Sequence, residues 1–321
     1  MLKYLARRLT FLFISIFLAS ISLFVLLRLL PGDPANALLS VGATPEQIAA
    51  ARHSVGSDLP MLTQFGKWLG QLFTLHFGNS LIGGYPVGPE ILSRLSITVP
   101  LTLSAFLLAV LIAVPLGFVA AYKARTWYGT ILNAISQLGI AIPVFWVGVL
   151  LIFGFALRWM ILPAGGFPIN GWSNFGEAVR SLVLPVCTIS LVMSASLIRY
   201  VRSATLDVLG SDYIRTSRAL GSSFIEAMWR HGLRNAAAPV ISILGIELAT
   251  TFVGAVVVES VFDLPGLGSL LVKAITQRDY PVVQGVLFAS TVAVLFIGFL
   301  ADLTQRILDP RLSKSLTRVS L

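Results

Sequence analysis

Few side chains in this chain of 321 residues stand where they could perform chemistry. No G-x-x-x-x-G-K-[ST] phosphate loop occurs, and no nucleophile has a base beside it in the sequence. The one cysteine, Cys187, has no partner for an intrachain disulfide. Three histidines are not paired at metal-ligand spacing: His53, His76 and His231. We therefore predict no catalytic residue, no metal site and no bound cofactor, and the chain by itself is not expected to be an enzyme.

Glu247 is the acidic residue in the middle of an apolar segment, Ala237–Val258, with no basic residue three or four positions away. Charged groups inside membrane spans usually face a cavity or a bundle interior, so Glu247 is a candidate for lining an aqueous pathway. A protonated, hydrogen-bonded packing residue is the alternative. Arg28, near the end of another apolar segment, is explained by a long side chain that reaches the membrane surface.

The longest basic interruption between apolar segments is residues 212–235. Asp212 can cap a short helix that begins near Tyr213, and Gly221 suits the left-handed position that ends it. Ser223 and Glu226, three positions apart, have the pattern of a capping box that starts a second helix. We predict two short helices joined by a glycine elbow, in a segment suited to be held by a partner.

Glu247 and the basic segment 212–235 are positioned by the long apolar segments on either side of them. The chain is 56% hydrophobic and 12% charged, with a mean hydropathy of +0.87, whereas soluble domains are about one-quarter charged. We predict an all-α polytopic membrane protein with six transmembrane helices, each of which needs about 20 apolar residues. The predicted spans are Phe11–Leu30, Ile97–Ala121, Ile131–Leu157, Leu182–Ile198, Ala237–Val258 (opened by Pro239 near its first turn) and Val282–Ala301.

The distribution of basic residues predicts the orientation of the spans. If the N-terminus is cytoplasmic, 15 of the 23 Lys and Arg residues fall in cytoplasmic segments and seven in outer segments. Both termini are therefore expected in the cytoplasm, and the net charge of +9 needs no nucleic-acid partner. A signal peptide cleaved at Ala35-Asn-Ala37 is an alternative for the first span, but its apolar run is long and prolines crowd the site.

The segment between the first two spans, residues 31–96, contains its own helical signals. Thr44-Pro45-Glu46 predicts a helix start, and residues 62–73 carry apolar side chains at helical spacing. This amphipathic helix could lie at the outer membrane interface or belong to a small folded cap. Both interpretations stay open.

Ten short motifs, in order along nearly the whole chain, resemble the B-type permease subunits of oligopeptide, dipeptide and nickel ATP-binding-cassette (ABC) importers. Single motifs are weak, but their order is specific. The motifs are Arg28-Leu-Leu-Pro-Gly-Asp-Pro-Ala35, Phe77-Gly-Asn-Ser80, Ile142-Pro-Val-Phe-Trp146, Leu206-Asp-Val-Leu-Gly210, Asp212-Tyr-Ile-Arg-Thr-Ser-Arg-Ala-Leu-Gly221, Arg230-His-Gly-Leu-Arg-Asn235, Val258-Glu-Ser-Val-Phe262, Leu264-Pro-Gly-Leu-Gly268, Arg278-Asp-Tyr-Pro-Val-Val-Gln284 and Leu308-Asp-Pro-Arg311.

The resemblance implies the type I ABC importer transmembrane fold, with a coupling helix that docks on an ATPase. Arg215-Thr-Ser217 stands where the family's loop has Glu-Ala-Ala. The apolar anchors would be Phe224, Ile225, Met228 and Trp229, and the alternative is a helix pair held on the inner leaflet by acidic lipid. The coupling residues are predicted to be Asp212, Arg215, Thr216, Arg218, Ala219, Gly221, Phe224, Glu226 and Met228.

The implied organisation is a cytoplasmic N-terminus and first span (1–30), a long extracytoplasmic loop (31–96), a five-helix core (97–308) with coupling loop 203–235, and a cytoplasmic tail (309–321). The implied function is that of a permease subunit in a bacterial inner membrane. It would form the pathway with a homologous second permease, for di- or oligopeptides delivered by an extracytoplasmic binding protein. Two partner ATPases would bind ATP and Mg²⁺, membrane lipid would surround the spans, and no nucleic acid would be bound. The alternatives are a nickel or metal-chelate importer, an ion-coupled secondary carrier, and a non-transporting scaffold.

Overall fold

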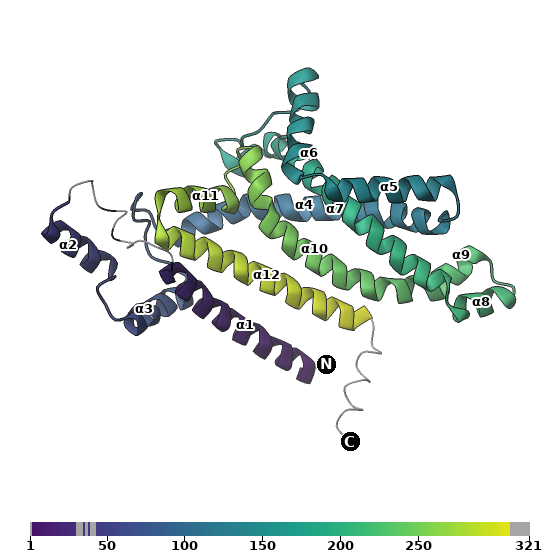
Figure 1. The fold of residues 1–321 in the computed structure, drawn as a ribbon, viewed down its shortest axis with the longest axis horizontal. Coiled ribbons are helices and arrows are strands. Elements are labelled where there is room, and N and C mark those ends of the chain that lie inside the picture. Colours follow the sequence, from purple (N-terminus) through teal and green to yellow (C-terminus); the bar gives the residue numbers. More distant parts are fainter. Residues whose placement is uncertain (1, 30–34, 36–37, 39–42, 309–321) are drawn as a thin grey trace. The chain divides into compact units, whose positions relative to one another are not determined.

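A computed structural model describes residues 2–29, 35, 38 and 43–308, and every regular element in this part of the chain is a helix (Figure 1). The helices are α1 (Leu2–Leu29), α2 (Pro45–Val55), α3 (Met61–Phe73), α4 (Val87–Tyr122), α5 (Trp127–Ala141), α6 (Val144–Leu151), the π-helix η2 (Ile152–Arg158), the 3-10 helix η3 (Gly171–Ser173), α7 (Phe175–Leu209), α8 (Asp212–Ala219), α9 (Phe224–Ala227), the π-helix η4 (Met228–Gly232), α10 (Leu233–Val261), α11 (Leu267–Gln277) and α12 (Tyr280–Leu308). The predicted tail 309–321 and most of the segment around the cleavage site Ala35-Asn-Ala37 lie outside the described residues.

Five helices in the described part are long and apolar enough to cross a membrane: α1, α4, α7, α10 and α12. The predicted third span, Ile131–Leu157, is instead bent by 100° between α5 and α6. The break falls at Ile142, whose backbone is extended (φ −83°, ψ 125°), because the ring of Pro143 disfavours a helical residue before it. The spans number five, or six if the bent pair counts as one, and the all-α multi-pass fold is confirmed.

Most spans extend beyond their apolar stretches. α4 begins at Val87 rather than near Ile97, and α7 covers Phe175–Leu209 rather than Leu182–Ile198. Hydropathy marks only the part of a helix that lipid would surround, whereas backbone hydrogen bonding continues through polar residues. The prediction that Pro239 opens the fifth span was wrong, because α10 begins at Leu233 and Pro239 lies inside it.

The residues group into two compact units. Unit 1 contains Met1–Val99 and Asp263–Leu295, and unit 2 contains Pro100–Phe262 and Phe296–Leu321. α4 and α12 therefore contribute residues to both units.

The core of unit 1 is a chain of aromatic rings. Phe24 of α1 lies with its ring centroid 5.2 Å from Phe65 and 5.8 Å from Trp68, both on α3. Trp68 lies 6.4 Å from Phe288 of α12, which lies 6.0 Å from Phe77. The predicted amphipathic helix thus exists as α3, and its inner face packs as part of a folded unit.

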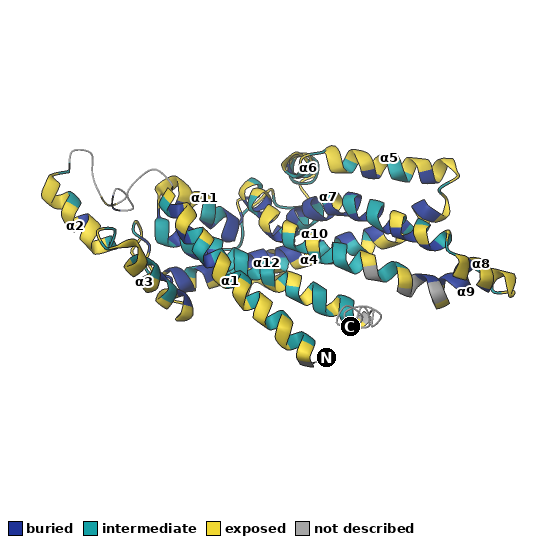
Figure 2. Ribbon diagram, turned by 60° about the horizontal axis from the view of Figure 1, so that its bottom comes forward, coloured by how far each residue is buried: buried dark blue, intermediate teal, exposed yellow. Residues whose placement is uncertain are grey.

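α7 is the central helix of unit 2. Its most apolar stretch is 67% buried within the chain, against 11% for α10, and it contacts α5, α6 and α10 (Figure 2). Two glycines bring neighbouring helices close: a Cβ on Gly117 of α4 would lie 2.7 Å from Val201, and one on Gly139 of α5 would lie 2.6 Å from Ala195. α7 is therefore held tightly on two sides, and it leads directly to the basic segment 212–235.

Candidate functional site

The basic segment forms the two predicted short helices, α8 and α9, at the end of α7 (Figure 1). The prediction that Asp212 caps α8 was wrong by one position, because Ser211 is the N-cap and Asp212 is the first helical residue. A carboxylate in the first turn is favourable beside the positive end of the helix dipole. Asp212 Oδ1 also lies 3.7 Å from Arg215 Nη1.

The predicted glycine elbow is present. Gly221 has φ +94°, a left-handed conformation that side chains disfavour. The Gly221 N–H donates to the Arg218 carbonyl (3.1 Å) and the Ser222 N–H donates to the Ser217 carbonyl (3.2 Å). These two bonds form a Schellman motif, which terminates α8 and fixes the direction of the chain into α9.

The start of α9 has the Ser223 part of the predicted capping box, since the Glu226 N–H donates to Ser223 Oγ at 3.2 Å. The Glu226 carboxylate Oε1 lies 3.7 Å from Arg230 Nη1. α9 then continues through the π-helix η4 into α10 without a break. Arg230–Asn235 is thus the beginning of the following helix, and the elbow is rigidly attached to α10.

Two of the predicted coupling residues support the segment from inside. Met228 has only 6% of its surface exposed and lies in a buried cluster with Val208, Ile214 and Ala227. Phe224 is half-buried against this cluster, and its ring centroid lies 4.9 Å from that of Tyr122 in α4. Both side chains therefore contribute to the packing within the segment.

The outward surface of the segment is an apolar group with a charged rim, here called the loop face. Its apolar members are Leu220, Ile225 and Trp229, which are 82%, 67% and 72% exposed. Sequence reasoning missed Leu220, the residue before the elbow glycine. The predicted residues that lie exposed around this group are Asp212, Arg215, Thr216, Arg218, Ala219 and Glu226.

Glu247 lies on α10 and reaches α7, where its Oε1 accepts a hydrogen bond from Ser196 Oγ at 2.7 Å. It lines a cavity of about 210 Å³. The other lining residues come from the α5–α6 bend, α7 and α10: Ile140, Val144, Ile189, Val192, Met193, Ser196, Thr250, Thr251, Gly254 and Val258. The carboxylate is thus both hydrogen-bonded and open to a cavity between the two helices that flank the basic segment.

Unit 1 contains a buried acid that sequence reasoning did not single out. Asp279 is 2% exposed, and it accepts hydrogen bonds from Ser80 Oγ and from the Leu81 N–H (3.1 Å). Ser80 Oγ in turn accepts from the Gly83 N–H at 2.8 Å. Two motifs far apart in the sequence therefore meet at one carboxylate, and no signal in the sequence pointed to this contact.

Two family models together match most of the chain. Residues 113–314 match the model "Binding-protein-dependent transport system inner membrane component", and residues 1–102 match "Binding-prot-dependent transport system membrane comp, N-term".

Curated relatives match over nearly their full lengths. The chain is 37% identical to a putative peptide transport system permease protein of Brucella abortus, over 92% of this chain and 93% of the relative. It is 36% identical to the oligopeptide transport system permease protein AppB of Bacillus subtilis, over 97% and 99%. It is 34% identical to the di/tripeptide transport system permease protein DppB of Pseudomonas aeruginosa, again over 97% and 99%.

Proposed function

The chain belongs to the family of binding-protein-dependent transport system inner membrane components, and we propose that it is the permease subunit of an importer of di- and oligopeptides. The observation that carries the proposal is identity of 34–37% over nearly the whole chain to permeases named for peptides, oligopeptides and di/tripeptides. Membership of this family, together with the apolar helices, makes the chain a multi-pass inner-membrane protein. It also favours ATP-driven import over an ion-coupled carrier.

The proposed orientation has both termini in the cytoplasm, as the basic residues indicate. Segment 31–96 is then extracytoplasmic, and the coupling loop 203–235 faces the cytoplasm. The loop face fits a groove on a partner ATPase, because a few exposed apolar side chains within a charged rim are typical of docking surfaces. Leu220, Ile225 and Trp229 are the proposed anchors, with Arg215 and Arg218 on the rim.

The remaining coupling residues hold this surface in place. Gly221 sets the elbow, while Met228 and Phe224 pack beneath it. Glu226 lies beside Arg230 and Asp212 beside Arg215, so each acid is placed next to a basic residue of the same segment. The ATP and Mg²⁺ that supply the energy are bound by two partner ATPases, one of which this surface would contact.

Motion of the coupling loop would be transmitted along α7 and α10 to the middle of these two transmembrane helices. These helices enter and leave the loop, and they carry the hydrogen-bonded pair Ser196 and Glu247. At 1.5 Å per residue, this pair lies about 20 Å along the helices from the loop. A shift of α8 and α9 between two ATPase states would tilt α7 and α10, and thereby change the cavity at Glu247.

We place Glu247 on the pathway for this reason. An ionisable group within a span is costly unless it faces polar groups or a cavity, and this carboxylate does both. The homologous second permease would complete the pathway, and an extracytoplasmic binding protein would deliver the peptide.

The test is purification of the complex through an affinity tag on this chain. The purified complex is expected to contain a second permease and two ATPases. Reconstituted into vesicles with ATP on the ATPase side and the binding protein on the opposite side, it is expected to accumulate a labelled short peptide. A chain that accumulates the peptide alone, without ATP or partner subunits, would refute the proposal.

A further inference from the structure

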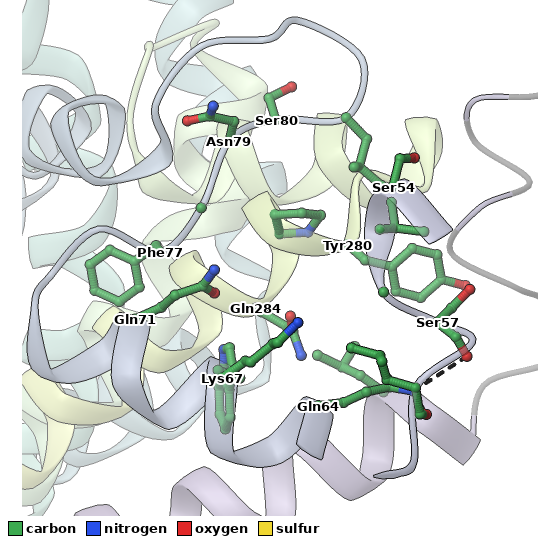
Figure 3. Close-up of a pocket in the computed structure, with 18 of the residues that line it drawn as sticks. Ser54, Ser57, Gln64, Lys67, Gln71, Phe77, Asn79, Ser80, Tyr280 and Gln284 are labelled. Atoms are coloured by element: carbon green, nitrogen blue, oxygen red, sulfur yellow. Dashed lines mark hydrogen bonds between the residues drawn. The ribbon is translucent and has the colours of Figure 1, made fainter. Parts of the chain in front are cut away.

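Unit 1 contains a cavity of about 900 Å³ that the coupling mechanism does not use (Figure 3). The end of α1, the α2–α3 region, the turn at 77–84 and the start of α12 surround it. Its volume falls within the range of small-molecule sites, which is about 300–1,000 Å³. Under the proposed orientation, it opens on the extracytoplasmic side.

The lining of this cavity is cationic. Its charged groups are the side chains of Arg28 and Lys67, and no Asp or Glu is among the described residues that line it. The Arg28 guanidinium lies 5.5 Å from the ring centroid of Phe24. The neighbouring acid, Asp58, is outside the lining and is hydrogen-bonded to His53 (Nδ1–Oδ2 2.9 Å); this bond lowers the pKa of the Asp58 carboxyl, and the charge of Lys67 adds to the effect. The ammonium group of Lys67 in this cavity attracts an anionic group.

Amide side chains surround the lysine. Figure 3 shows the side chains of Lys67, Gln71 and Gln284 extending into the same cavity, with Asn79 on the turn above. Each amide can both donate and accept hydrogen bonds, as a peptide group does. Beside these groups Trp68, which also lines the cavity, supplies an apolar surface. Together, these groups suit a carboxylate next to a peptide bond better than a bare inorganic anion.

The wall formed by the turn is rigid. The Ser80 N–H donates to the Tyr85 carbonyl (2.9 Å), and the Val87 N–H donates to the Gly78 carbonyl (3.0 Å). The buried Asp279 carboxylate fastens this turn to the start of α12, as described above. Asn79 and Gln284, on the two connected segments, are therefore held in place before a ligand arrives, which lowers the entropy lost on binding.

We propose that this cavity is a binding site for short peptides with a free C-terminal carboxylate. Lys67 supplies the opposite charge, and the amides of Gln71 and Gln284 bond the adjacent peptide group. The choice of a peptide over other carboxylates rests on the proposed function.

The experiment uses the full-length chain with its co-purified subunits, in zwitterionic nanodiscs and without binding protein. Binding of trialanine and of trialanine amide is measured by calorimetry. A charge-assisted hydrogen bond contributes about 1.5 kcal/mol or more, so the wild type is expected to prefer the free acid by about tenfold. Lys67→Met should abolish that preference, and Lys67→Arg should keep it. Lys273→Met is the matched control, since Lys273 is an exposed lysine of unit 1 that is not among the residues lining the cavity.

Three results would overturn the site: no binding of trialanine to the wild type, an unchanged acid preference in Lys67→Met, or displacement of trialanine by inorganic phosphate at equal concentration. ATP-driven uptake of trialanine is measured separately, in vesicles and with the binding protein present. If trialanine is taken up but does not bind in this cavity, the binding site is refuted and the proposed function is not. If trialanine binds in a manner that depends on Lys67 but is not taken up, the proposal of a peptide cargo is refuted and the binding site is not.

Discussion

Alanine substitutions at two adjacent residues of the coupling loop are expected to affect different properties, namely affinity for the ATPase and stability of the loop. Trp229 is 72% exposed on the loop face, whereas Met228 is 6% exposed in the cluster beneath it. Trp229→Ala should therefore weaken attachment of the ATPase without unfolding the loop. Met228→Ala should loosen the loop itself, and should weaken attachment only as a consequence.

The structure sets the size of each effect. Truncation of a buried methionine to alanine costs about 2–5 kcal/mol, since it removes apolar contacts and leaves a cavity. An exposed surface substitution changes the free energy of unfolding by only about 0.5 kcal/mol. A tryptophan that anchors an interface contributes about 2 kcal/mol or more, which corresponds to roughly a 30-fold loss in affinity for the ATPase.

The assay titrates the purified ATPase onto the permease in nanodiscs and follows thermal unfolding of the same samples. Trp159→Ala is the control, because Trp159 is also exposed (60%) but follows η2, away from the coupling loop in the sequence. Trp229→Ala with unchanged affinity for the ATPase would refute the docking surface. Met228→Ala with an unchanged Tm would refute the assignment of Met228 to a supporting core.

Three further variants test other parts of the structure. Gly245→Ala places a Cβ 2.2 Å from a side-chain carbon of α12, so it should cost about 1–3 kcal/mol and lower the Tm, while Gly254→Ala on the same helix, with open space at its Cβ, should not. Asp279→Ala removes the acceptor of the Leu81 N–H and should lower the free energy of unfolding by at least about 1–3 kcal/mol. An unchanged Tm would contradict a structural role for Asp279. Glu247→Gln keeps an acceptor for its hydrogen bond but removes the ionisable carboxyl group, so peptide uptake should change at unchanged Tm; normal uptake would indicate a packing residue.

Local signals in the sequence were enough to predict much of the fold. Apolar runs located the spans, Gly221 ended α8 where only a left-handed residue fits, and Thr44 began α2 with a complete capping box. Each of these features depends on neighbours within a few residues. Pro143 was visible too, but hydropathy alone gave no reason to break a continuous apolar run at that point.

Long-range pairings could not be predicted in the same way. Ser80 and Asp279 are separated by 199 residues, and no spacing rule connects them. Their meeting depends on how α11, α12 and the turn at 77–87 pack together. The cavity beside them was equally invisible, because Lys67 and Gln284 belong to different helices and each looks like an ordinary surface residue by itself.

The coupling loop shows why a periodic pattern cannot tell an inner face from an outer one. Phe224 and Met228 form one pair at i, i+4 spacing, and Ile225 and Trp229 form a second pair one position later, so either could face a partner. Burial separates them: the first pair packs on the cluster beneath the loop, and the second is exposed. Met228 also packs closely on Gly232, where a Cβ would lie 2.8 Å from the Met228 sulfur and 3.2 Å from Val208 Cγ1. We therefore propose that the second pair, Ile225 and Trp229, and not the first would contact a partner ATPase.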